Sequence, residues 1–252
     1  MKVLLYLVYR MYKTIILIKE VRLVILYDKK DKESGKNYAY RVLKENIMSL
    51  ELKPGQLLSE IELSEILGIS RTPIREVLMK LKNEHLIEVK PQSGTYVSLI
   101  DFDLVKEAIF MRFVLEEKVL KEACENFSEK YFLELEKNLY AQQIIADMKG
   151  GEKEFHKLDN QFHKLFFLGV NKPNVWKSIL NISTHYNRMR LLSQAESSKL
   201  DVVKQHKRFV EIIKDKDMEK VEPLIKEHIN YSEEMWKKLI REENEFYSFF
   251  KK

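Results

Sequence analysis

The chain has 252 residues, a net charge of +5, 45% hydrophobic residues and 33% charged residues. These values are typical of a globular chain with one domain of ordinary size and one smaller domain, and they exclude a disordered chain. The single cysteine, Cys124, excludes a disulfide within the chain and agrees with a reducing cytoplasm. The charge does not by itself indicate nucleic-acid binding, because its excess lies in residues 1–36, which hold nine Lys/Arg and four Asp/Glu.

Residues 1–36 form an N-terminal extension and linker. The longest uncharged run is Val3–Tyr9, which is too short for a membrane span of about 20 apolar residues. A signal peptide is excluded as well, because no small-residue cleavage site follows a proper apolar core. Three interpretations stay open: an extra strand or helix packed on a dimer, a basic amphipathic arm, or a non-native extension from an upstream start. The polar run 28–37 is typical of a linker.

The stretch 61–86 predicts a helix, a turn at Gly68 and a second helix, after a preceding helix over about 38–50. Ser70 or Thr72 can cap the second helix. Apolar residues repeat along this helix at spacings of three and four, at Ile74, Val77, Leu78 and Leu81. This stripe packs the second helix onto the first, so the pattern indicates a helix-turn-helix.

The polar end of the second helix carries Arg71, Thr72 and Arg75. In a helix-turn-helix this N-terminal end meets base edges and phosphates. The segments 86–90 and 95–98 then alternate between apolar and polar residues around a turn, which predicts the two strands of a wing.

Residues 37–99 resemble the winged DNA-binding domain of the GntR regulator family. The motifs that carry the resemblance are Pro54-Gly55, Leu58-Ser59-Glu60, Glu62-Leu63-Ser64-Glu65, the run LGISRTPIREVL from Leu67 to Leu78, and Gly94. The resemblance implies a homodimer whose recognition helices read the half-sites of a near-palindromic operator in double-stranded DNA. The DNA-binding residues that it implies are Ser70, Arg71, Thr72, Arg75 and Gly94.

Residues 103–239 predict an all-α bundle of about six helices, and residues 240–252 form a C-terminal tail. The helices are expected over 103–126, 129–148, 152–169, 173–194, 199–214 and 217–240. The aromatic tail is expected either to pack on a neighbour as a last helical turn or to fray. The predicted fold class is therefore mainly α, with an N-terminal winged helix-turn-helix followed by a helical bundle.

The bundle contains one carboxylate and three imidazoles that can meet in its core. Asp159 and His163 are four residues apart and leave the same face of one helix. His206 and His228 lie on the last two helices, which form an antiparallel hairpin of open register. Of the remaining histidines of the bundle, His156 is expected to lie behind the ligands or at the surface, and His185 to be a surface or structural residue.

This Asp and His set resembles the metal-binding FCD domain of the FadR subgroup of GntR regulators, over about residues 104–238. The resemblance implies that Asp159, His163, His206 and His228 bind a divalent metal ion (Zn, Ni or Mn), with positions left for water or a ligand carboxylate. It also implies that Arg112 holds an effector carboxylate, with Arg188 and Arg190 as candidates of the same kind. The alternative for these arginines is an ion pair with a nearby Glu.

The sequence thus predicts a cytoplasmic transcription regulator, by default a repressor, whose operator binding changes when a small carboxylate binds at the metal site. A second interpretation keeps the regulator but gives it a metal-free pocket for an organic acid or acyl ligand. A third, remote interpretation is a helical metalloenzyme. No histidine is followed by Asp or has Glu three residues before it, and no Gly-rich phosphate loop occurs. We therefore expect no catalytic residues and no membrane partner.

Overall fold

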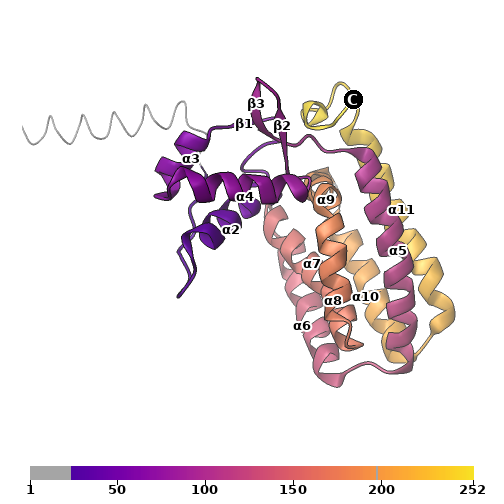
Figure 1. Ribbon diagram of the computed structural model, residues 1–252. Helices are drawn as coiled ribbons and strands as arrows, with labels where there is room; N and C mark the ends of the chain where they lie inside the picture. The colour runs from indigo at the N-terminus through magenta and orange to yellow at the C-terminus, as the bar shows by residue number, and fades with distance from the viewer. Residues whose placement is uncertain (1–23, 197) are drawn as a thin grey trace, which may run out of the picture. The chain divides into compact units, whose positions relative to one another are not determined.

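The computed structural model describes residues 24–196 and 198–252, without the side chains of residues 195, 196 and 230–235. The chain divides into two compact units, with the boundary between Ser98 and Leu99, and each unit is described by itself (Figure 1). The expectations for residues 1–23 lie outside the described residues. The predicted fold class is confirmed, since a winged helix-turn-helix precedes a helical bundle.

The first unit combines three helices with a small antiparallel sheet in its described residues. Its elements are α2 (Gly35–Met48), β1 (Leu57–Leu58), α3 (Glu60–Leu67), α4 (Arg71–Asn83), β2 (Ile87–Lys90) and β3 (Gly94–Val97). The strand order is β1-β3-β2, with Ile87 opposite Val97 and Leu57 opposite Tyr96. Sequence analysis did not predict β1, because two residues are too few to show an alternating pattern.

The apolar stripe of α4 forms much of the core of the first unit. Ile74, Val77 and Leu81 are fully buried, and α4 packs against both α2 and α3. The turn between α3 and α4 depends on Gly68, whose φ of 65° lies in the left-handed region that glycine adopts without steric cost. Ser64 also closes this turn, because its Oγ donates to the carbonyl of Ile69 at 2.6 Å.

The backbone conformation of the wing favours glycine at position 94, where the packing is also close. Gly94 has a φ of +130°, and a Cβ added there would lie 2.8 Å from Leu57 Cδ1. This residue begins β3, directly after the turn that joins the two strands of the wing. Its conformation and close packing thus account for glycine at this position without any contact to DNA.

The second unit consists of α-helices in antiparallel packing, seen as the magenta to yellow part of Figure 1. Its helices are α5 (Phe102–Glu125), α6 (Glu129–Ala146), α7 (Glu152–Gly169), α8 (Pro173–Ile182), α9 (Thr184–Glu196), α10 (Lys199–Asp215) and α11 (Val221–Leu239), with 3-10 turns η1 (Met218–Lys220) and η2 (Tyr247–Phe249). The core of the unit contains fully buried Leu120, Phe162, Phe166 and Phe167. None of the described helices is long and apolar enough to cross a membrane.

One helix boundary in the second unit differs from the prediction. The helix expected over 173–194 is two helices, because α8 ends at its C-cap Ser183 and α9 starts at Thr184. Neither glycine nor proline marks the break, and its local signal is the pair Ser183-Thr184, residue types that are preferred at the N-terminal cap of a helix. Both residues at the break are buried, so that the break occurs inside the packed unit.

The C-terminal tail does not fray, since it includes the 3-10 turn η2 and packs on other residues of its own unit. Ile100 donates its backbone N–H to the carbonyl of Phe249 at 2.8 Å and accepts from Lys251 N at 2.9 Å. The ring of Phe250 stacks on Phe102, with centroids 5.3 Å apart. The tail therefore packs on the residues at the start of α5, through backbone hydrogen bonds and ring stacking.

Helix caps in the first unit provide a matched test of local structure. Ser59 accepts a hydrogen bond from Glu62 N at 3.3 Å and caps α3, whereas Ser70 holds the N-cap position of α4 without a side-chain capping hydrogen bond. We expect Ser59→Ala to lower the free energy of unfolding by about 1 kcal/mol and Ser70→Ala to change it little. Urea unfolding followed by circular dichroism measures both, and equal losses would contradict the assigned caps.

Candidate functional site

Four of the predicted DNA-binding residues lie together at one end of α4. Ser70, Arg71, Thr72 and Arg75 are all exposed there. The Nε of Arg75 donates to Glu60 Oε2 at 2.7 Å, and because both side chains are partly in water this pair is a weak one that a phosphate can replace. The fifth residue, Gly94, belongs to the wing.

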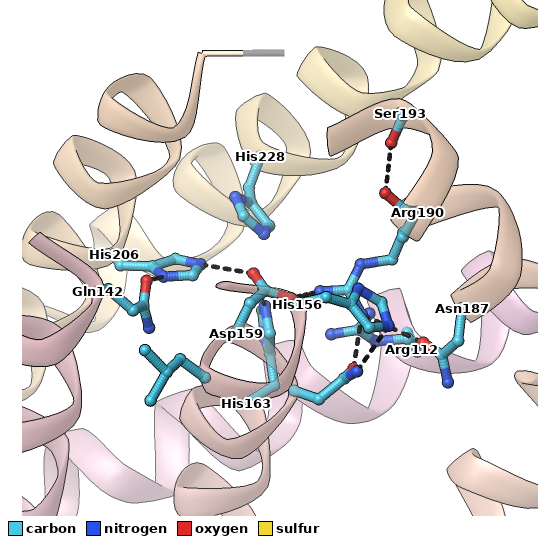
Figure 2. A network of polar contacts seen from close by, with 12 residues as sticks. Arg112, Gln142, His156, Asp159, His163, Asn187, Arg190, Ser193, His206 and His228 are labelled. Atoms are coloured by element: carbon cyan, nitrogen blue, oxygen red, sulfur yellow. Dashed lines mark hydrogen bonds and ion pairs between the residues drawn. The ribbon is translucent and has the colours of Figure 1, made fainter. Parts of the chain in front are cut away.

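Three histidines meet in the core of the second unit. His163 of α7, His206 of α10 and His228 of α11 place one ring nitrogen each within 4.8 Å of one another. Figure 2 shows the three rings around the carboxylate of Asp159. The Oδ1 atom of Asp159 lies 3.4 Å from His206 Nε2 and 3.9 Å from His163 Nε2.

The local structure explains how these side chains reach one place. Asp159 and His163 are one turn apart on the buried face of α7. Helix α10 ends at Lys216, whose φ of 58° is left-handed, and α11 then returns along α10. This hairpin fixes the register that the sequence leaves open, and it sets His206 beside His228 with ring centroids 5.3 Å apart.

The three imidazoles are in the protonation state that a metal ligand needs. Burial lowers the pKa of His163, His206 and His228, and for His206 and His228 the charge of the neighbouring histidines lowers the pKa further. The hydrogen bond and charge of Glu116 oppose this effect at His163. Neutral imidazoles at neutral pH keep a lone pair for a metal ion.

The two nitrogens of these histidine rings have different surroundings. Each Nδ1 has an oxygen partner on another helix: Glu116 Oε2 at 2.9 Å from His163, Gln142 Oε1 at 2.7 Å from His206, and Gln205 Oε1 at 2.6 Å from His228. The Nε2 atoms of His163 and His206 are buried and make no hydrogen bond. Buried polar atoms normally have partners, so these two nitrogens beside a carboxylate fit a bound cation.

The first candidate for effector binding, Arg112, is part of a buried ion pair. Its Nε donates to Glu116 Oε1 at 2.6 Å, and both side chains are about 95% buried. Burial acts to raise the pKa of Glu116, but the positive charge of Arg112 and the hydrogen bond from His163 outweigh it and hold this pKa far below its ordinary value. Arg112 thus keeps Glu116 ionised, so that a negatively charged carboxylate lies next to His163.

The other two arginines lie on α9. Arg190 forms an ion pair with Asp159 and donates from Nη1 to Asn160 Oδ1 at 2.8 Å. Arg188 is fully buried, and desolvation lowers its pKa to about 9, so it is still cationic at neutral pH. Its Nη2 lies 3.2 Å from His185 Nδ1.

The two histidines of the second unit that lie outside the predicted ligand set are buried and structural. His185 Nδ1 accepts the backbone N–H of Asp101 at 2.9 Å, and His156 Nε2 lies 2.9 Å from Asn160 Nδ2. Sequence reasoning missed Glu116, Gln142 and Gln205. The first has a faint signal, since it stands four residues after Arg112 on one helix, but nothing in the sequence connects the two glutamines to histidines of other helices.

Comparisons with known proteins agree with this architecture. Residues 36–97 match the family described as "Bacterial regulatory proteins, gntR family", and residues 107–231 match the "FCD domain". The chain is 30% identical over 210 residues to the HTH-type transcriptional repressor RspR of Escherichia coli, covering 83% of this chain and 92% of the relative. It is 32% identical over 192 residues, 75% of this chain and 80% of the relative, to an uncharacterized HTH-type transcriptional regulator in an unstable DNA locus of Streptomyces ambofaciens.

A solved structure gives the same result for the fold. E. coli McbR/YncC superposes with a TM-score of 0.69 at 20% identity, covering 83% of this chain and all of that one. Both relatives compared by sequence are named as HTH-type transcriptional regulators or repressors. The chain therefore belongs to the GntR family of transcription regulators, and it carries an FCD domain after its winged helix-turn-helix.

Proposed function

We propose that Asp159, His163, His206 and His228 bind one divalent metal ion, and that a small carboxylate bound at this ion changes the affinity of the protein for its operator. The observation that carries the proposal is the pair of buried Nε2 atoms without hydrogen bonds next to the Asp159 carboxylate. Imidazole and carboxylate ligands suit Zn, Ni or Mn. When bound, the ion would supply Lewis-acid positions for an effector carboxylate.

The buried charges of the second unit favour an anionic effector. Its described buried ionic side chains are three arginines (Arg112, Arg188 and Arg190) and two acids (Glu116 and Asp159). They leave one positive charge in excess, and a divalent ion would add two more. Because buried charge is costly without a partner, a carboxylate from outside would be bound favourably next to this cluster.

In this proposal the protein is a cytoplasmic homodimer that binds a near-palindromic operator through two copies of α4. We propose repression as the default outcome, as the name of the E. coli relative RspR suggests. Effector and DNA are then linked reciprocally, since an effector that weakens operator binding must itself bind the DNA-free form more tightly. Binding of an organic acid or acyl ligand at the arginines without an ion is the alternative.

The exposed end of α4 provides the test of DNA binding. We expect Arg71→Ala to weaken binding to an operator sequence, selected from a random DNA pool with the parent protein, by about 1 to 3 kcal/mol if Arg71 contacts a base. Fluorescence anisotropy at several salt concentrations measures this loss. Lys130→Ala, which removes an exposed positive charge from α6 of the second unit, is the matched control, and equal affinity of both variants would refute the assignment.

Metal binding is tested by elemental analysis after the protein is incubated with Zn, Ni or Mn and dialysed. We expect about one ion per chain in the parent and little in His206→Ala and His228→Ala, because each variant removes one of four ligands. Added metal should also raise the melting temperature of the parent and of the control below, but not that of His206→Ala or His228→Ala. His85→Asn, at an exposed histidine of the first unit, serves as control.

An ion content near zero in the parent with all three metals would refute the proposed metal site. Titration of small carboxylates in the absence of metal would then decide whether the arginines alone bind the effector.

The ion pair between Arg112 and Glu116 is also a stability element. We expect Arg112→Leu to lower the free energy of unfolding by about 3 to 5 kcal/mol, because it leaves a buried carboxylate without its charged partner. The double variant Arg112→Leu/Glu116→Gln should recover part of this loss. Lys106→Leu, which breaks an exposed pair with Asp103 on the same helix, should change stability little. Equal losses in the single and double variants would show that packing, and not charge, accounts for the effect.

A further inference from the structure

We propose that Asn138 and Gln142 of α6 are positioning residues that set the ring tautomer of His206, so that its Nε2 presents a lone pair to the metal ion. The inference rests on the proposed metal site. It gives a role to two side chains that lie behind the ligand and supply no ligand atom themselves.

Three hydrogen bonds in series carry the argument. Asn138 Nδ2 lies 3.1 Å from the backbone carbonyl of Leu158, Gln142 Nε2 lies 2.7 Å from Asn138 Oδ1, and Gln142 Oε1 lies 2.7 Å from His206 Nδ1. A backbone carbonyl can only accept. Asn138 must therefore turn its NH₂ group towards Leu158 and its oxygen towards Gln142.

The direction of each further bond follows from this first one. Because the Asn138 oxygen accepts, Gln142 turns its NH₂ group towards Asn138 and its own oxygen towards His206. An amide oxygen cannot donate, so the hydrogen between Gln142 and His206 belongs to Nδ1 of the ring. In a neutral imidazole the other nitrogen then carries the lone pair. That nitrogen, Nε2, is the one that lies 3.4 Å from Asp159 Oδ1.

Burial makes the reversed arrangement costly. Gln142 is fully buried and Asn138 is 7% exposed, so water does not compensate for a lost hydrogen bond. Turning both amides over would set the Asn138 oxygen against the Leu158 carbonyl oxygen, where neither atom can donate a hydrogen, and would leave the Asn138 hydrogen bond to Leu158 unmade. Each unsatisfied buried group costs free energy, and so the series holds one direction from Leu158 to His206.

A stacked ring completes the positioning. His206 lies parallel to Phe162, with centroids 4.2 Å apart and an angle of 12° between the planes. The stack restrains the plane of the imidazole, and the bond to Gln142 restrains its rotation within that plane. The other two histidines have comparable partners, since Glu116 and Gln205 present oxygens to the Nδ1 atoms of His163 and His228.

The first test needs no variant. Long-range proton–nitrogen correlation spectra of the metal-free protein distinguish a protonated ring nitrogen from one with a lone pair, and the signals of His206 are assigned by their loss in His206→Gln. We expect Nδ1 of His206 to be the protonated nitrogen. Protonation at Nε2 would overturn the inference.

Variants of Gln142 then connect the tautomer to metal affinity. Gln142→Met keeps the approximate volume but removes the acceptor, so we expect a mixture of tautomers and a zinc affinity lower by about 10- to 100-fold in chelator competition. Gln142→Glu retains an accepting oxygen and should keep the Nδ1–H tautomer and most of the affinity. Gln143→Met, at the exposed neighbour on α6, should behave as the parent.

The outcomes separate the inference from the proposed function. A Gln142→Met protein with a lower melting temperature but an unchanged tautomer and zinc affinity would make Gln142 a packing residue only, and the inference would fail. If Gln142→Met does not fold, the parent spectrum and Gln142→Glu still decide. A parent that binds none of Zn, Ni and Mn would refute the proposed metal site, whereas its spectrum would still test the series of hydrogen bonds.

Discussion

The centre of the helical unit depends on one constraint, which is that a polar group removed from water needs a partner. Glu116 meets this constraint twice, because one oxygen accepts from Arg112 and the other lies 2.9 Å from His163. Gln142 does so as well, between Asn138 and His206. The bond of Glu116 to His163 connects α5 with α7, and the bond of Gln142 to His206 connects α6 with α10, so the polar core specifies helix register as well as chemistry.

Arg112 and Arg190 each contribute both to packing and to the balance of buried charge. Arg112 and Arg190 flank the ring of Tyr186, with their guanidinium carbons 5.1 and 5.3 Å from its centroid. Each also holds a carboxylate, Glu116 in one case and Asp159 in the other. A ligand that draws on either arginine must therefore compete with an existing ion pair, which couples occupancy of the site to the packing of α5 and α9.

Sequence patterns predicted those features that depend only on residues close together in the chain. The spacing of Asp159 and His163 placed both on one face of a helix, and the apolar stripe of α4 identified a recognition helix, because both depend only on residues a turn or two apart. The break at Ser183 was missed although its residue types favour a helix cap. The strand β1 and the oxygen partners of the histidines were also missed. These depend on contacts between distant segments, such as Gln142 with His206, and no spacing along the chain encodes them.

The attachment of the tail to Ile100 and Phe102 bears on where the helical unit can be cut from the chain. The match to the FCD domain spans residues 107–231, so a fragment with these limits would lack Ile100, Phe102 and the tail that packs on them. A fragment that starts at Leu99 but ends at residue 231 would lose both backbone hydrogen bonds to Ile100 and the ring that stacks on Phe102. Its first helix would then begin with an exposed aromatic side chain and two unpaired backbone groups. An independently folding fragment of this unit accordingly has to extend from Leu99 through Lys251, so the boundaries of the structural unit are wider than those of the sequence family.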